Sequence, residues 1–222
     1  MKKCRRKISW IFIFALLPFF WACAPPPVLV SDDISTNITY SCRGRTVDVL
    51  YDYVLTERDA WRLYQIVKKN RSECLNLHLF NPGGNAFVMF DVLNTLERLE
   101  AEGVRINTFA RGYIASAAVP IFVMGKERVI SRDCWAMMHP GAWKGKDALV
   151  GEKTMRVFEA MEKRYAEIVS ERTGFTYEEI ACFMNIGSEL KDEHGRVLDS
   201  NSGVNWFDAQ EALEKGLATR IA

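Results

Sequence analysis

Three short segments of the chain combine residue types that can carry acyl-transfer chemistry. Asn81 to Gly84 contains a glycine pair, which lets a main-chain N–H approach a ligand closely. Gly112 to Ala118 contains Ser116 among small neighbours, where a hydroxyl can act as a nucleophile. Met137 to Gly141 contains His139, which can take and return a proton. Together the segments supply a nucleophile, a base and an oxyanion-binding backbone, and so indicate covalent catalysis by a serine.

Each feature has an ordinary structural interpretation when it is taken alone. A serine at a helix start is commonly an N-cap, a Gly-Gly pair after a strand is commonly a turn, and one histidine is commonly structural. Their co-occurrence carries the argument, because the three segments close three successive strand-containing units. Open parallel sheets bind ligands at the carboxyl ends of their strands, so the segments are expected to meet there.

The rest of the chain alternates strand and helix patterns that can bring these segments together. Strands are expected where apolar residues alternate, and helices where they recur every three or four residues. The expected strands cover residues 46–53, 75–79, 106–110, 128–131, 135–139 and 218–221, and the expected helices cover residues 60–69, 86–102, 116–124, 152–173, 176–185 and 208–216. Strands separated by helices need crossover connections, which predicts an α/β fold with a parallel sheet covered by helices.

Composition and charge exclude several classes of protein. The 222 residues are 49% hydrophobic and 26% charged, which is typical of a globular protein and excludes a largely disordered chain. Removing the five basic residues between positions 2 and 7 takes the formal charge from +1 to −4. A mildly acidic body without a basic stripe argues against nucleic acid as a partner.

The first 24 residues are predicted to be a secretory or lipoprotein signal. Basic residues precede an apolar run over residues 8–24, which Pro25 to Pro27 end. The run is short for a membrane span of about 20 residues, so an uncleaved anchor is the second interpretation. Cys23 resembles a lipidated cysteine, although Phe20 and Trp21 depart from the lipoprotein pattern. We expect a location in the cell envelope on the periplasmic side, with membrane tethering, a linker over residues 25–44 and a catalytic domain over residues 45–222.

The cysteines outside the leader lack the spacing of a metal site. They are Cys42, Cys74, Cys134 and Cys182. Both disulfides and buried free thiols are compatible with the sequence, but no C-x-x-C pair occurs. No nucleotide-binding loop of the G-x-x-x-x-G-K type occurs either. No metal or other cofactor is therefore expected.

Other polar residues receive structural interpretations. His78 lies within an expected strand and is interpreted as a structural histidine, and His194 is expected to be solvated in a surface loop over residues 187–203. Lys144 and Lys146 suggest a serine–lysine dyad, but the glycines around them favour an exposed turn.

From about residue 46 to residue 221, the chain resembles the proteolytic subunit of the Clp protease, a serine peptidase family with a crotonase-like fold. Residues 81–84 resemble its Ser-Pro-Gly-Gly turn, with Asn81 where the serine would be. Residues 112–118 resemble its Gly-x-Ala-Ala-Ser-Met-Gly segment, and residues 138–139 its Met-Ile-His segment. The resemblance implies repeated β-β-α units with a parallel sheet, a long handle helix at residues 151–174 and a C-terminal helix at residues 208–216.

The resemblance also implies roles for individual residues. Ser116 would be the nucleophile and His139 the general base. The main-chain N–H groups of Gly84 and Ala117 would form the oxyanion hole.

The third member of the triad is unassigned. The family's aspartate precedes an aromatic segment that resembles residues 205–207, which puts Val204 at its place. Residues 187–203 are an insertion directly upstream. Asp199 and Asn205 are therefore the two candidates for the third member.

Three functions compete on these observations. The leading hypothesis is an exported serine endopeptidase that hydrolyses peptides or unfolded polypeptide; it is expected to act without ATP, because a Clp-type ATPase partner would lack ATP outside the cytoplasm. The alternative is a catalytically impaired binding or scaffold protein that keeps the fold. A crotonase-type acyl-CoA enzyme is disfavoured, because such enzymes need no serine–histidine pair. The charged face and apolar stripe of residues 152–172 further predict a homo-oligomer.

Overall fold

The computed structural model describes residues 38–141, 152–184 and 204–222, and the fold is given for these ranges. Several predictions fall outside them and stay predictions: the signal over residues 1–24, Lys144 and Lys146, and the loop over residues 187–203 with His194 and Asp199.

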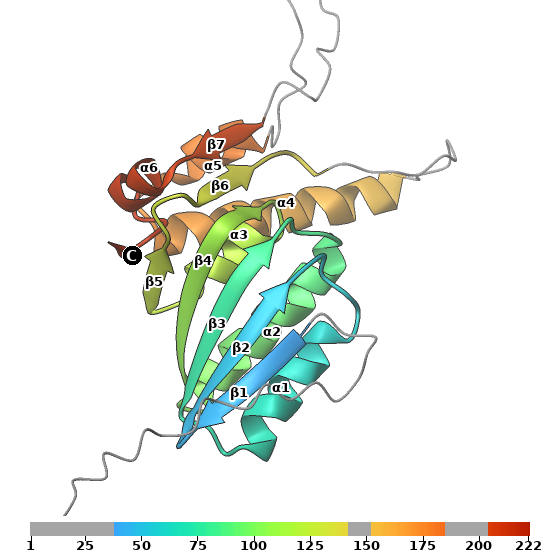
Figure 1. Cartoon of the computed structure of the whole chain (residues 1–222). Coiled ribbons are helices and arrows are strands. Elements are labelled where there is room, and N and C mark those ends of the chain that lie inside the picture. The colour runs from blue at the N-terminus through green and yellow to red at the C-terminus, as the bar shows by residue number, and fades with distance from the viewer. Residues whose placement is uncertain (1–37, 142–151, 185–203) are drawn as a thin grey trace, which may run out of the picture.

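An eight-stranded sheet forms the body of the protein (Figure 1). Six strands lie in the order β1-β2-β3-β4-β5-β8, with β1 antiparallel to β2 and the others parallel. Two more strands extend the sheet near its carboxyl end, since β6 pairs with the end of β4, and β7 pairs antiparallel with β6. The bounds are β1 Ile38–Arg43, β2 Thr46–Asp52, β3 Cys74–Asn81, β4 Arg105–Ala115, β5 Glu127–Ile130, β6 Trp135–Met138, β7 Asn205–Phe207 and β8 Arg220–Ile221.

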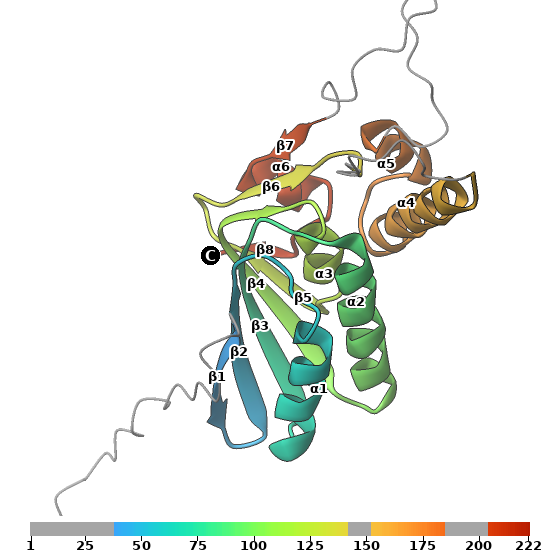
Figure 2. The same cartoon turned by 90° about the vertical axis from the view of Figure 1, so that its right-hand side faces the viewer.

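Helices cover one face of the main sheet, as Figure 2 shows for α1 and α2. The long helix α4 lies on the helix-covered side of the sheet, next to α3 (Figure 2). The bounds are α1 Asp59–Lys69, α2 Ala86–Ala101, α3 Ala118–Val123, α4 Glu152–Arg172, α5 Tyr177–Phe183 and α6 Ala209–Glu214. The predicted α/β fold with a mostly parallel sheet, a long helix and a C-terminal helix is therefore confirmed.

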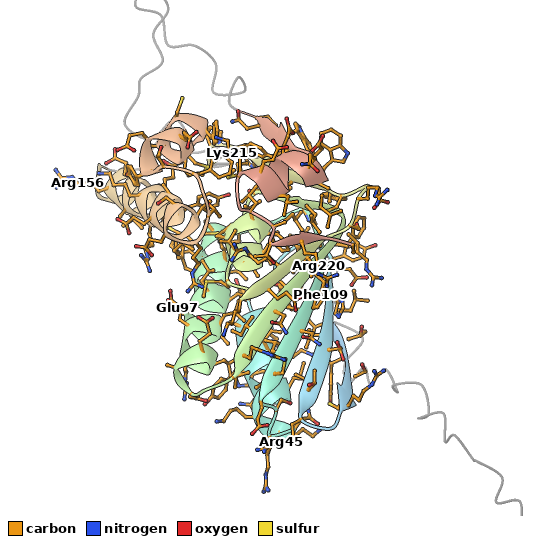
Figure 3. The ribbon with its side chains drawn as sticks, turned by 90° about the vertical axis from the view of Figure 1, so that its left-hand side faces the viewer. Arg45, Glu97, Phe109, Arg156, Lys215 and Arg220 are labelled. Atoms are coloured by element: carbon orange, nitrogen blue, oxygen red, sulfur yellow. The ribbon has the colours of Figure 1, made fainter. Side chains whose placement is uncertain are left out.

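Alternation along the strands explains which face the helices cover. In β2, Val47, Val49 and Tyr51 are buried, whereas Asp48 and Leu50 between them are half-buried or exposed. Side chains of successive strand residues point to opposite faces, so one face of β2 packs against the helices and the other does not. The same pattern places Phe109 of β4 on the face away from the helices (Figure 3).

The predicted structural role of His78 is confirmed on that second face. Its Nε2 lies 3.3 Å from Oδ1 of Asp48, and its ring stacks on Phe109 with the centroids 4.7 Å apart. Both contacts lie among residues of β2, β3 and β4, remote from the segments at the carboxyl ends of the strands (Figure 3).

A capping box begins each of the helices α5 and α6. The Thr176 hydroxyl accepts a hydrogen bond from the Glu179 N–H at 3.1 Å, and the Asp208 carboxylate accepts one from the Glu211 N–H at 2.8 Å. In each box the glutamate carboxylate accepts a hydrogen bond from the N–H of the capping residue, so main-chain N–H groups of the first turns of α5 and α6 have partners.

The residues before α1 form a different arrangement. Thr56 does not cap the helix; its N–H and hydroxyl both donate to the carboxylate of Asp59, at 2.7 and 2.6 Å. Asp59 is fully buried and also accepts a hydrogen bond from Tyr51 Oη at 2.5 Å. The buried Asp59 carboxylate therefore fixes the loop before α1 through its hydrogen bonds with Thr56. Burial and the Asp59 carboxylate together raise the pKa of the Tyr51 phenol.

Two expected boundaries are wrong because tertiary pairing overrides local patterns. The strand predicted to stop at residue 110 continues through Gly112 to Ala115, since β4 pairs first with β5 and then with β6. Gly112 has φ +63°, and a Cβ there would lie 2.6 Å from the Phe80 ring, so it bends the strand rather than ending it. The next helix accordingly starts at Ala118, two residues later than expected.

The sheet also contains two strands, β1 and β7, that lie outside the strand ranges expected from the sequence. β1 lies inside the range predicted as a linker, so the ordered sheet begins before residue 45. β7 is only three residues long and is stabilised by its pairing with β6.

The four described cysteines are free thiols, with Cys42 and Cys182 exposed and Cys74 and Cys134 buried. Among the described residues, no group of three or more His, Cys, Asp or Glu side chains is arranged to hold a metal ion. Within residues 38–141, 152–184 and 204–222, no helix combines the length and apolar character needed to cross a membrane.

Candidate active site

Ser116 lies in a sharp turn between β4 and α3. Its φ is +55°, a left-handed conformation that residues other than glycine rarely adopt. The turn is held on both sides, because the Ser116 N–H donates to the Met137 carbonyl at 2.7 Å and its own carbonyl accepts from the Val119 N–H at 3.0 Å. Outliers of this kind are concentrated at functional sites, where surrounding structure compensates for the strain.

Tyr165 of α4 contacts the same turn through a hydrogen bond. Its hydroxyl donates a hydrogen bond to the Ser116 carbonyl at 3.4 Å, and its side chain is buried. Burial raises the pKa of the Tyr165 phenol, so it stays a neutral donor across the physiological range.

The glycine turn after β3 lies directly against the serine turn. The Gly83 N–H donates to the Asn81 side-chain oxygen at 2.8 Å, which replaces a hydrogen bond that the sheet no longer supplies. On the other side, the Leu55 N–H donates to the Gly83 carbonyl at 3.1 Å, and Leu55 forms a parallel bridge with Gly84. The loop that Asp59 anchors therefore holds the glycine turn in position.

His139 follows β6, the parallel neighbour of the end of β4. Ala115 and Met137 are partners in the register, so Ser116 and His139 come one and two residues beyond a paired position at the same edge of the sheet. The sequence expectation that both segments meet at the carboxyl ends of parallel strands is thus met by the topology.

A cavity of about 730 Å³ brings the predicted site residues together. Ser116, His139, Gly84 and Ala117 all line it. Within the part of the chain that the structure describes, neither the Gly84 N–H nor the Ala117 N–H donates to a backbone carbonyl. Both amides are therefore free of the backbone pairing that would prevent them from binding an oxyanion.

Of the two candidates for the third member of the triad, only Asn205 lies among the described residues. Asn205 is half-buried at the start of β7 and pairs in register with Met138, the residue before His139. Asp199 lies outside the described residues. Val204, which the resemblance puts at the place of the triad aspartate, is 47% exposed and cannot carry a charge.

Two carboxylates of α4 line the cavity and were not singled out from the sequence: Glu159 and Glu162. The Gly141 N–H donates to Glu162 Oε1 at 3.2 Å, which ties the helix to the segment that carries His139. Burial raises the pKa of Glu162, the Gly141 hydrogen bond partly offsets this, and the charge of Glu159 adds to it. Their positions one turn apart beside the apolar stripe of the predicted helix are the signal that could have found them.

The family model described as Clp protease matches residues 55–222, which is most of the chain and includes every candidate site residue. The chain belongs to the Clp protease family. Membership of this family agrees with the α/β fold and supports a peptidase activity.

Individual relatives of the Clp protease family are distant in sequence. The chain is 22% identical over 213 residues to the ATP-dependent Clp protease proteolytic subunit 2 of Bifidobacterium longum, a match that covers 88% of this chain and 89% of the relative. Among solved structures, a mutant of ClpP1 from Listeria monocytogenes superposes with a TM-score of 0.62 at 17% identity, covering 81% of this chain and 91% of that one. The second likeness shows that the fold is shared.

Proposed function

We propose that this member of the Clp protease family is a serine endopeptidase that hydrolyses peptides or unfolded polypeptide without ATP. The observation that carries the proposal is the convergence of Ser116, His139, Gly84 and Ala117 on one cavity. A strained turn that presents a serine beside a histidine and two free amides is the arrangement that acyl transfer requires.

The proposed reaction passes through an acyl-enzyme. Ser116 Oγ attacks the peptide carbonyl carbon while its proton passes to the His139 imidazole, and the N–H groups of Gly84 and Ala117 hold the resulting oxyanion. The C–N bond then breaks, and His139 gives its proton to the departing amine. Water next attacks the ester and gives a proton to His139, which returns it to Ser116 as the acid product leaves.

Labelling with a fluorophosphonate probe tests the peptidase proposal directly. The full chain, purified in detergent, should be modified at a single peptide that contains Ser116, and Ser116→Ala should abolish the label. Ser170→Ala is the matched control, because Ser170 lies on α4 outside the described lining of the cavity and its hydroxyl donates to the Glu167 carbonyl. Modification of another serine would show that the nucleophile is wrongly assigned.

A second candidate function is a catalytically impaired binding or scaffold protein. The observation that favours it is Val204, an apolar and half-exposed residue at the place of the family's aspartate. This alternative predicts tight binding of unfolded polypeptide without turnover, and no fluorophosphonate adduct on Ser116.

We further propose that the chain is exported and tethered to the membrane on the periplasmic side of the cell envelope. The support is the basic cluster, apolar run and Cys23 of the first 24 residues. The wild-type protein should fractionate with the envelope, and Cys23→Ser should release it if a lipid is the anchor. Recovery from the cytoplasm alone would overturn the proposal and make a Clp-type ATPase partner plausible again.

Self-association is the remaining part of the proposal. Helix α4 buries Tyr165, Ile168 and Val169, whereas Val157 is exposed. Arg164 and Glu167 are also exposed and form an ion pair with an N–O distance of 3.3 Å. We expect a homo-oligomer, and a sedimentation mass equal to one chain at micromolar concentration would contradict this.

A further inference from the structure

We propose that the cavity beside Ser116 binds a lysine or arginine side chain of the substrate, with Glu162 as the specificity-determining residue. The inference rests on the proposed peptidase function, since it names the substrate class of that same site. It uses observations that the catalytic proposal does not need: the walls of the cavity, their charge, and the contacts of Glu162.

The walls of the cavity suit a long side chain with an apolar stem. Helices α2 and α4 supply most of them, and the rings of Phe87 and Phe158 meet edge to face with their centroids 6.1 Å apart. Lysine and arginine side chains bury their methylene groups along apolar surfaces while the charged end reaches a polar group. The large apolar residues of the lining are Phe87, Met89, Phe90, Phe158, Met161 and Met184.

The described lining of the cavity is acidic. Glu159 and Glu162 line it, one turn apart on α4, and no lysine or arginine is found among its described lining residues. The resulting negative potential attracts a cationic side chain and repels an acidic one. An apolar side chain of the same length would contact the apolar walls of the cavity equally well, but it would leave Glu162 without a counter-charge.

Glu162 is held in a defined orientation at the end of the cavity that carries the catalytic segments. Its Oε1 accepts the Gly141 N–H at 3.2 Å, and Gly141 is the second residue after His139. A Cβ on residue 141 would lie 3.0 Å from Oε1, so glycine lets the carboxylate approach the backbone. No described residue donates a hydrogen bond to Oε2, which leaves this oxygen for an ammonium or guanidinium group.

Burial raises the pKa of Glu162, as expected for a carboxylate that loses water without gaining a cation. An ammonium or guanidinium group in the cavity supplies that cation. Charge-assisted hydrogen bonds of this kind correspond to a preference of about 10- to 100-fold in kcat/KM.

Peptides that differ at one residue test the inference. A set with arginine, lysine, norleucine or glutamate before the scissile bond should be cleaved with kcat/KM at least about tenfold higher for the basic residues than for norleucine, with the glutamate peptide slowest. Glu162→Gln should reduce the ratio of arginine to norleucine to near one. Glu167→Gln, on the outer side of the same helix, should leave the ratio unchanged. Equal cleavage of the norleucine peptide by the wild-type protein would overturn the inference, and so would an unchanged ratio in Glu162→Gln.

Binding measurements separate this inference from the peptidase proposal. The Ser116→Ala protein should bind the fluorescent arginine peptide more tightly than the norleucine peptide, as measured by anisotropy, and Glu162→Gln in that background should remove the difference. If no peptide is cleaved but this binding preference is seen, the peptidase proposal fails and the specificity stands. If Ser116 is labelled and cleaves but neither assay prefers a basic residue, the specificity fails and the peptidase stands.

Discussion

Gly83 packs directly against the turn that presents Ser116. A methyl group on Gly83 would lie 2.6 Å from the Ala115 carbonyl oxygen, 2.9 Å from the Ala117 nitrogen and 2.9 Å from the Ser116 Cβ. Only a residue without a side chain permits this approach. The glycine turn and the serine turn therefore form one packed unit, and the position of the serine depends on a residue in a different strand–helix connection.

Gly83→Ala is predicted to damage both stability and the site. The left-handed φ of +91° costs an alanine about 1–2 kcal/mol, and the overlap with the serine turn adds about 1–3 kcal/mol. Gly103→Ala is the matched control, because Gly103 has φ +87° but nothing within 4 Å of its Cβ position. Urea unfolding should give the larger loss for Gly83→Ala, and fluorophosphonate labelling of Ser116 should slow in that variant alone. Equal losses in the two variants would mean that the contact with the serine turn is unimportant.

The same pair of residues indicates what sequence alone can predict here. A glycine pair after a strand, a serine among small residues and a strand-ending histidine are local patterns, so they were identifiable without a structure. The left-handed φ of Ser116 was not, because it depends on hydrogen bonds to Met137 and Val119 and on the space that Gly83 leaves.

The strand β7 and the extension of β4, which were not predicted from the sequence, depend on pairing with distant segments. β7 is too short to show a pattern and exists because it pairs with β6, and β4 extends through Gly112 because it gains β6 as a neighbour. Glu162 is a related case. Its place on the predicted helix could have marked it as a neighbour of the apolar stripe, but its contact with the Gly141 N–H and its place in the cavity depend on distant segments.

The reactivity of the four described thiols toward alkylation should follow their exposure to solvent. Cys134 is fully buried, and burial with the nearby Asp133 raises its pKa to about 12, so almost no thiolate forms at pH 8. Brief treatment with iodoacetamide should modify the exposed Cys42 and Cys182 but not the buried Cys74 and Cys134. Cys42 should react slowly for an exposed thiol, because partial loss of contact with water and the negative charge of Asp48 raise its pKa.

Peptide mass spectrometry of the native and urea-unfolded protein measures this pattern. The two buried thiols should be alkylated only after unfolding. Modification of Cys134 in the native protein would contradict the packing of the segment between β5 and β6.

Glu162 should make the folded state less stable as pH rises. Burial raises its pKa in the folded protein above the ordinary value near 4.5, so the folded state holds this proton more tightly than the unfolded chain. Its favourable contribution is fully present below pH 4.5 and is lost as pH rises through the raised pKa. The difference in unfolding free energy between wild type and Glu162→Gln should therefore decrease over that interval, as measured by urea titrations at several pH values.

Glu179 provides a control of opposite sign. The hydrogen bond from Lys215 lowers its pKa, with help from the Thr176 N–H, so its contribution is present above pH 4.5 and is lost as pH falls. Glu179→Gln should thus lose stability mainly at neutral pH. The same direction of change in both variants would contradict the assignment for Glu162.

The third member of the triad can be sought by alanine substitution. Asn205 pairs with Met138, beside His139, and its amide is the described candidate for orienting the imidazole. The orienting group holds the histidine in the correct tautomer. In a serine protease triad, replacing the orienting aspartate by asparagine lowers turnover by about 10⁴. We predict that Asn205→Ala lowers kcat by about 10- to 100-fold with little change in KM, whereas Val204→Ala, at the exposed neighbouring position, leaves both unchanged. Asp199→Ala and the double variant complete the set. Unchanged turnover in Asn205→Ala, Asp199→Ala and the double variant would mean that neither residue is the third member, and the serine–histidine dyad or the impaired scaffold would then lead.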